Sequence, residues 1–205
     1  MTVLQLQKPS YRSYETLSRT IELGRFIRSE EDFYEFCLDN DHLKIERNAD
    51  GTIKIMALTG GKTGEKNAEL NAELVFWKRK NGGRVFDSST GFRLTNGATR
   101  SPDAAWIRED RWQELTAEQQ EKHPPIAPDF VVELMSVTDD LKESQQKMQE
   151  YIENGVQLAW LIASKTEEVF IYRADGTVTK HIGFSESLDG EEIMAGFTFD
   201  LTLLK

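Results

Sequence analysis

The fold is decided by residues 130–163, which read FVVELMSVTDDLKESQQKMQEYIENGVQLAWLIA. The stretch begins with an apolar run, 130–135, that a single acid interrupts. Asp140-x-x-Glu143 follows, a capping-box pattern that predicts a helix running to the stop at Asn154-Gly155. The remainder is again apolar and has the length of a buried strand. Strand, helix and strand in this order predict a βαβ-like unit.

The segments around this unit predict the rest of an α/β fold. A β-hairpin is expected on each side, because alternating apolar and polar residues flank the turns at Asp50-Gly51 and Asp175-Gly176. We also expect a helix after Ser29, a helix over 65–80, strands near 84–86, 91–94 and 104–107, and a surface excursion over 109–128 with a short helix at 116–122. Together they predict a mixed β-sheet flanked by helices, with peripheral hairpins. Residues 1–28 are expected to be an N-terminal extension and 29–205 a single domain.

The composition is that of a globular, acidic chain. Of its 205 residues 39% are hydrophobic, enough to form a core, which excludes wholesale disorder. The net charge of −10 repels DNA overall, so a nucleic-acid partner requires a local basic patch or a bound cation. The chain has one cysteine, Cys37, no secretory signal, and no apolar run near the roughly 18 residues of a membrane span. We therefore expect a cytoplasmic protein with no membrane partner.

Several common kinds of site are excluded by the sequence. It contains no G-x-S-x-G, phosphate loop, H-E-x-x-H or G-x-G-x-x-G motif. The three histidines lie far apart, which favours surface residues over a zinc site, and Cys37 is interpreted as a core thiol. The Gly60-Gly61 loop is interpreted as a plain helix start rather than a phosphate cradle.

The informative feature is a pair of acids placed against apolar strands. Asp103 directly precedes the apolar run 104–107, and Glu133 interrupts the run 130–135. An ionised carboxylate there is costly unless it is paired or bound to metal. The two acids are 30 residues apart, compatible with neighbouring strands, and two converging carboxylates suit Mg²⁺. The alternative is that Glu133 faces solvent on an edge strand while Asp103 caps a turn.

Several segments in a fixed order carry a family resemblance. They are Thr63-Gly64-Glu65-Lys66-Asn67-Ala68-Glu69, Thr90-Gly91-Phe92-Arg93-Leu94, Ser101 to Ile107, Pro128 to Ser136, Asp140-Leu141, Lys147 to Tyr151, Gly155-Val156 and Trp160-Leu161-Ile162. The set resembles the Uma2 family, a branch of the PD-(D/E)xK restriction-endonuclease-like nucleases, over roughly residues 29 to 200. The resemblance implies a restriction-endonuclease-like core, a divalent metal and a phosphodiester substrate.

The chain departs from the broad nuclease signature at one position. That signature has an acid and a lysine two residues apart on one strand, but the position two after Glu133 is Met135. The candidate replacement is Lys147, which matches the lysine of the Uma2 helix motif and precedes Tyr151 by four residues. A lysine on a solvated helix face is the alternative. Asp103 and Glu133 are expected to hold the metal, with the Leu134 carbonyl as a further ligand.

Two weaker features extend this hypothesis. Glu69 lies on the predicted helix 65–80 and is a weak candidate for a further metal ligand, or else part of a solvated face. Residues 78–100 carry six basic residues and one acid, a local excess that would suit phosphate contacts or arise by coincidence. From this basic strip we expect Arg84, Arg93 and Arg100 to contact nucleic acid.

The sequence thus predicts an endonuclease that uses Mg²⁺ or Mn²⁺ to hydrolyse DNA. The proposed catalytic residues are Asp103, Glu133 and Lys147. The rival interpretation is a non-catalytic nucleic-acid-binding or assembly module that keeps the nuclease fold, because Met135 breaks the signature. A homodimer is compatible with the endonuclease, since cutting two strands requires two sites.

Overall fold

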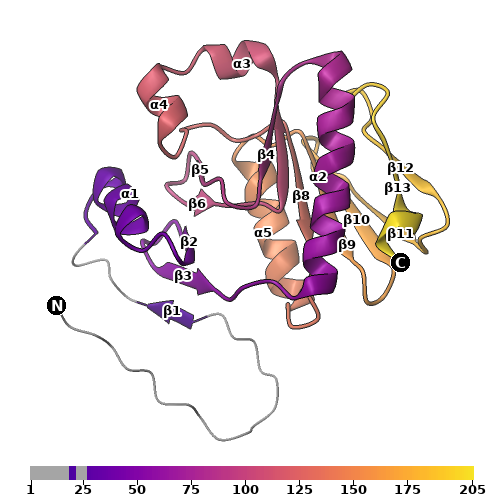
Figure 1. The fold of residues 1–205 in the computed structure, drawn as a ribbon, viewed down its shortest axis with the longest axis horizontal. Helices are drawn as coiled ribbons and strands as arrows, with labels where there is room; N and C mark the ends of the chain where they lie inside the picture. The colour runs from indigo at the N-terminus through magenta and orange to yellow at the C-terminus, as the bar shows by residue number, and fades with distance from the viewer. Residues whose placement is uncertain (1–18, 22–26) are drawn as a thin grey trace, which may run out of the picture.

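The computed structural model describes residues 19–21 and 27–205. The predicted extension, 1–28, lies mostly outside the described residues. The described part is an α/β fold with two main sheets. The larger sheet, of six strands, contains the βαβ unit (Figure 1). None of its helices is long and apolar enough to span a membrane.

The central sheet has six strands in the order β11-β10-β9-β8-β7-β4. The strands are β4 (Arg84–Asp87), β7 (Ala104–Ile107), β8 (Phe130–Leu134), β9 (Leu158–Ala163), β10 (Glu168–Arg173) and β11 (Val178–Ile182). β8 and β9 are parallel neighbours that the helix α5 (Leu141–Glu153) connects in the chain. The other strand pairs of this sheet are antiparallel. The predicted βαβ unit and mixed sheet are confirmed.

Alternate residues of β8 face two different layers. Phe130, Val132 and Leu134 pack in a core with Leu70 and Leu74 of α2 (Gly61–Asn81). On the opposite face, Val131 packs in a second core with Met148 and Tyr151 of α5. Because side chains alternate along a strand, Glu133 shares the face of Val131 and lies under α5.

A second sheet of five short strands, in the order β1-β3-β2-β6-β5, lies beside the central one, and α1 (Glu30–Asp39) packs on it (Figure 1). Its strands are β1 (Arg19–Ile21), β2 (Lys44–Arg47), β3 (Ile53–Met56), β5 (Phe92–Arg93) and β6 (Thr99–Arg100). The predicted hairpin 42–56 is confirmed as β2 and β3, and Ser29 caps α1 as expected, with Asp32 completing a capping box.

Three parts of the fold differ from the sequence-based prediction. α2 begins at Gly61, four residues before the predicted start, because Gly61 and Gly64 lie in the first helical turns instead of forming a break. The two-residue β6 is too short to show a periodic pattern. The excursion contains α3 (Glu109–Gln113) as well as the expected short helix α4 (Ala117–Glu121), and the chain ends with β12 (Ser187–Asp189), β13 (Thr198–Asp200) and the 3₁₀ helix η1 (Leu201–Leu204).

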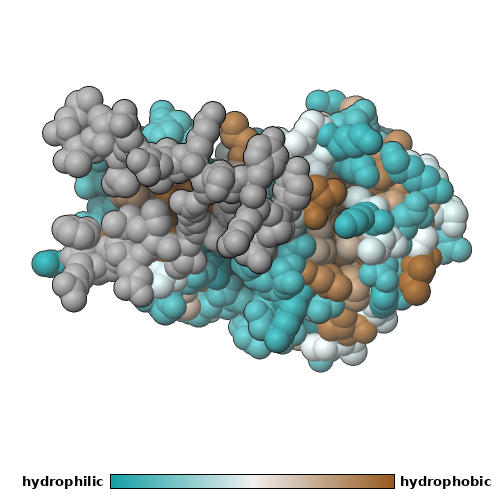
Figure 2. All heavy atoms as spheres, turned by 90° about the horizontal axis from the view of Figure 1, so that it is seen from below, coloured by the Kyte–Doolittle hydropathy of each residue, from teal (hydrophilic) through white to brown (hydrophobic). Residues whose placement is uncertain are grey.

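The surface seen from below in Figure 2 is largely hydrophilic where it is coloured, and its hydrophobic residues are scattered among polar ones. Exposed large apolar side chains include Leu58 and Val137, on the segments that lead into α2 and α5.

Candidate active site

Asp103 and Glu133 lie side by side at one end of the central sheet. Ala104 of β7 pairs with Val132 of the antiparallel β8, so continuing this register by one residue places Asp103 opposite Glu133. Their side chains are only 14% and 16% exposed. The neighbouring strands expected from the spacing are therefore present, and Glu133 is not on a solvated edge strand.

Asp103 is held by the next strand and by α2. Its Oδ2 accepts a hydrogen bond from the Leu134 backbone N–H at 2.8 Å, and its Oδ1 accepts one from Asn67 Nδ2 at 3.2 Å. Asn71, one turn further along α2, donates to the Asp103 carbonyl oxygen at 3.1 Å. Lys44 Nζ lies 3.8 Å from Asp103 Oδ1. Three groups, from α2, β8 and β2, thus contact the Asp103 carboxylate, and a fourth, Asn71, holds the backbone of the same residue.

Glu133 is held from the opposite layer by α5. Its Oε1 accepts a hydrogen bond from the Tyr151 hydroxyl at 2.8 Å and lies 2.8 Å from Lys147 Nζ. Burial raises the pKa of Glu133, the charges of Asp103 and Glu46 raise it further, and Lys147 opposes this. Because a desolvated carboxylate among like charges favours proton or cation binding, Glu133 has the electrostatics of a cation ligand.

Lys147 joins Glu133 to a second acid that the sequence did not single out. Its Nζ lies 2.8 Å from Oε1 of Glu46 as well as 2.8 Å from Glu133. Burial alone would lower the pKa of Lys147, but the two carboxylates together raise it above its usual value. Lys147 is therefore firmly charged. Its ammonium contacts the acids of the candidate site, so it does not lie on a solvated helix face.

Glu46 is a buried residue of the β2–β3 hairpin, with a side chain 2% exposed. Its Oε1 accepts a hydrogen bond from the Ser101 N–H at 2.9 Å, and Arg100 Nη1 lies 3.6 Å from its Oε2. Burial on its own would raise the pKa of Glu46, yet Lys147 and Arg100 outweigh it and the pKa is lowered. We call Asp103, Glu133, Lys147 and Glu46 the charge cluster.

Met135 occupies the position where the nuclease signature has a lysine. It is partly buried and packs on the α5 side of the sheet with the second core. The charge cluster instead takes its cation from Lys147 on α5, one turn before Tyr151.

Glu69 does not join the charge cluster. It is exposed, and it follows Asn67 by two residues, a rotation of roughly 200° around α2. The residue that α2 presents to Asp103 is Asn67, and its Oδ1 is buried without a hydrogen-bond partner among the described residues. The sequence signal for Asn67 was its place in the 63–69 motif.

Two acids of the charge cluster, Asp103 and Glu133, carry oxygen donors of the kind that a hard divalent cation takes. Mg²⁺ is usually bound by one or two carboxylates and keeps several waters, and Asp103 and Glu133 provide such a pair. The unpartnered amide oxygen of Asn67 is a third donor of the same chemical kind beside Asp103. In the described part of the chain, no group of three or more histidine, cysteine, aspartate and glutamate residues is arranged to enclose a metal.

The three arginines predicted to bind nucleic acid do not form one surface. Arg100 is 8% exposed, and its guanidinium pairs with Glu150 at 2.5 Å. It is therefore held inside the protein, where it cannot contact a phosphate, and the prediction for Arg100 is corrected. Arg84 forms two hydrogen bonds with Glu109. In the β4–β7 ladder it lies opposite Ile107, at the other end of β7 from Asp103. Arg93 lines a cavity of about 250 Å³ whose other lining residues include several acids.

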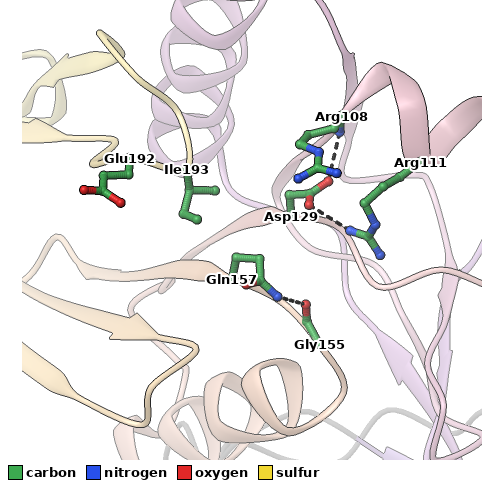
Figure 3. A pocket seen from close by; sticks show the side chains of 7 residues that line it. All are labelled: Arg108, Arg111, Asp129, Gly155, Gln157, Glu192 and Ile193. Atoms are coloured by element: carbon green, nitrogen blue, oxygen red, sulfur yellow. Dashed lines mark hydrogen bonds and ion pairs between the residues drawn. The ribbon is translucent and has the colours of Figure 1, made fainter.

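A cavity of about 370 Å³ lies at the far end of β8 from Glu133 (Figure 3). Its basic side chains are already matched: Arg111 pairs with Asp129 at 2.9 Å and Arg108 with Asp110 at 2.7 Å. The charge cluster is therefore the stronger candidate for chemistry.

Comparisons with known proteins agree with this fold. The family model Uma2, described as "Putative restriction endonuclease", matches residues 30–203. A crystal structure of "a putative nuclease belonging to DUF820" from Anabaena variabilis is similar, with a TM-score of 0.66 and 18% identity over 78% of this chain and 88% of that one. At that identity the likeness shows the fold alone. No curated protein matched the chain. Because the family model covers most of its length, the chain belongs to the Uma2 family.

Proposed function

We propose that the protein is a nuclease that hydrolyses phosphodiester bonds of DNA with the help of Mg²⁺ or Mn²⁺. The observation that carries this proposal is the juxtaposition of Asp103, Glu133 and the charged Lys147 at one end of the central sheet. The description of the Uma2 family as putative restriction endonucleases supports it.

Each residue has a distinct role in this proposal. Asp103 and Glu133 would hold the cation, with the Leu134 carbonyl as a further oxygen donor. When bound, a divalent cation polarises the phosphate and lowers the pKa of a water molecule. Lys147 is too firmly charged to accept a proton, so it would stabilise the negative charge that develops on the phosphate.

The remaining contacts orient these groups. Tyr151 fixes one oxygen of Glu133, while Asn67 and the Leu134 N–H fix Asp103. Their geometry is set by packed helices and strands, which hold a site more precisely than loops do.

The test is a cleavage assay on supercoiled, linear and single-stranded DNA with Mg²⁺, Mn²⁺ or EDTA. We expect metal-dependent cleavage that Asp103→Asn lowers by at least ~10²-fold, the scale of losing one essential catalytic group. Asp39→Asn is the matched control, because Asp39 is exposed on α1, and it should cleave like the wild type. DNA binding without cleavage under any of these conditions would favour the non-catalytic module.

A further inference from the structure

Lys147 stands between two carboxylates at equal distance. Its Nζ is 2.8 Å from Glu133 Oε1 and 2.8 Å from Glu46 Oε1. The two acids come from different sheets, since Glu133 is on β8 of the central sheet and Glu46 on β2 of the second. One ammonium group is thus shared by Glu133, a proposed metal ligand, and by an acid of the second sheet.

Glu46 is poorly placed to bind a metal itself. Its Oε1 already receives the Ser101 N–H and Lys147, and Arg100 lies beside its Oε2. Its side chain is also the more deeply buried of the two acids. A carboxylate buried in this way requires a counter-charge, because an unpaired buried charge is strongly destabilising.

Arg100 does not fully supply that counter-charge. It lies 3.6 Å from Glu46, but it makes two hydrogen bonds with Glu150, at 2.5 and 3.1 Å. The closest cation to Glu46 is therefore Lys147.

The sharing matters for cation binding at Glu133. If Glu133 were the sole carboxylate partner of Lys147, an incoming cation would have to displace a buried ammonium that has no other counter-charge. With Glu46 in place, Lys147 remains paired with a carboxylate when Glu133 binds the cation. No long movement is needed, because Nζ already lies within hydrogen-bond distance of Glu46.

We propose that Glu46 is a positioning residue that receives Lys147 and thereby frees Glu133 to bind a divalent cation. This inference rests on the proposed function, in which Asp103 and Glu133 hold the cation. Glu46, a residue of the second sheet, thereby contributes to the site. It acts through Lys147 and not by contact with the metal or substrate.

The experiment is a calorimetric titration of Mn²⁺ alone into the full chain. Glu46→Gln should weaken Mn²⁺ binding by about tenfold or more, because Lys147 then pairs with Glu133 alone. Glu143→Gln is the matched control: Glu143 lies one turn before Lys147 on the same helix and pairs with Lys54, so Mn²⁺ binding should not change. Equal binding by wild type and Glu46→Gln would overturn the inference.

A double-mutant cycle separates this role from a general charge effect. In a Lys147→Met background, Glu46→Gln should change Mn²⁺ affinity by less than about twofold, because the group through which Glu46 acts is gone. A tenfold effect that persists in this background would show that Glu46 acts as a distant negative charge, and would overturn the inference.

Glu46→Asp keeps the test open if Glu46→Gln fails to fold. It preserves the charge but withdraws the carboxylate from Lys147 by one methylene, so Mn²⁺ affinity should still fall, and wild-type affinity in this variant would overturn the inference. Asp103→Asn distinguishes a failure of the proposed metal site from a failure of the role given to Glu46. Wild-type protein that binds no Mn²⁺ overturns the proposed function, whereas binding that Asp103→Asn abolishes upholds the metal site and leaves Glu46 to be judged by its own variants.

Discussion

At the scale of single residues, Lys147 is the cation that pairs with two acids of the charge cluster, Glu133 and Glu46. Lys147→Met should lower DNA cleavage by at least ~10²-fold, because the charge beside the phosphate is lost. It should also lower the free energy of unfolding by about 3 kcal/mol, since removing one member of a buried ion pair leaves the others uncompensated. Single-turnover cleavage and urea denaturation measure the two effects.

Lys142→Met is the control for this change, because Lys142 is exposed on the same helix. It should leave both quantities near their wild-type values. Unchanged cleavage in Lys147→Met would show that the lysine has a structural role only.

Cys37 is a second residue whose environment fixes its chemistry. Burial raises the pKa of its thiol to about 11. At pH 8 only about one thiol in a thousand is then ionised, and the thiolate is the reactive form. Alkylation by iodoacetamide should therefore be far slower than that of free cysteine at pH 8 and should accelerate as the pH rises toward 11. Alkylation at pH 8 as fast as that of free cysteine would contradict the raised pKa.

The sequence signal was uneven for the members of the charge cluster. Asp103 and Glu133 stood out because each acid adjoins an apolar run, and Lys147 because of the family motif. Glu46 gave no such signal: in its hairpin it follows Ile45 in an alternating pattern that normally places an acid in solvent. Its burial arises from partners at positions 100, 101 and 147, which a local pattern cannot reveal.

At the scale of elements, the end of α5 is anchored by the side chain of Asn154. Its Oδ1 accepts hydrogen bonds from the Thr95 hydroxyl at 2.7 Å and the Asn96 N–H at 2.8 Å, and its Nδ2 donates to the Glu150 carbonyl. Asn154→Ala should lower the free energy of unfolding by about 2 kcal/mol, because three hydrogen bonds made by the buried Asn154 side chain are lost. Urea denaturation measures this.

Gln149→Ala serves as the comparison for Asn154→Ala. Gln149 is exposed on the same helix, and within residues 27–205 its side chain bonds only Glu153, one turn away, so its removal should cost less than about 0.5 kcal/mol. Equal losses in the two variants would mean that the anchor contributes nothing beyond helix propensity.

The elements that the sequence predicted well are those defined by local contacts. The parallel β8–α5–β9 unit and the two hairpins each show a periodicity and a turn within one short stretch. Gly61 and Gly64 suggest a break, so the sequence predicts a start of α2 that is four residues too late, although the helix includes both glycines. β6 exists through its pairing with β2 and β5, which no short window of sequence contains.

At the scale of the whole molecule, the acidic chain requires local positive charge to approach DNA. The basic residues 78–80 lie in the last turn of α2, about 16 Å or more along the helix from Asn67, whereas Lys62 and Lys66 lie at the same end as Asn67. We therefore expect the lysines at the start of α2 to contact phosphate.

Lys62→Gln with Lys66→Gln should weaken DNA binding and reduce the slope of log affinity against log salt by up to about 2. The matched double variant, Lys78→Gln with Lys80→Gln, removes the same charge from the other end of α2 and should change the slope less. Fluorescence anisotropy over a series of salt concentrations measures both. A larger effect at Lys78 and Lys80 would return the contact to the basic strip predicted from the sequence.

The hydrogen bond between Lys147 and Glu46 also bears on how the protein is made. These two residues are 101 positions apart, and Asp103 and Glu133 lie between them in the chain. During synthesis the amino-terminal part emerges first, so the hairpin that carries Glu46 must wait for most of the domain to leave the ribosome. Contacts between such distant positions form slowly, because a long loop must close before they are gained. A nascent or truncated chain that ends before residue 147 therefore cannot assemble the charge cluster, and the proposed cleavage activity would be withheld from a cell until translation of this domain is nearly finished.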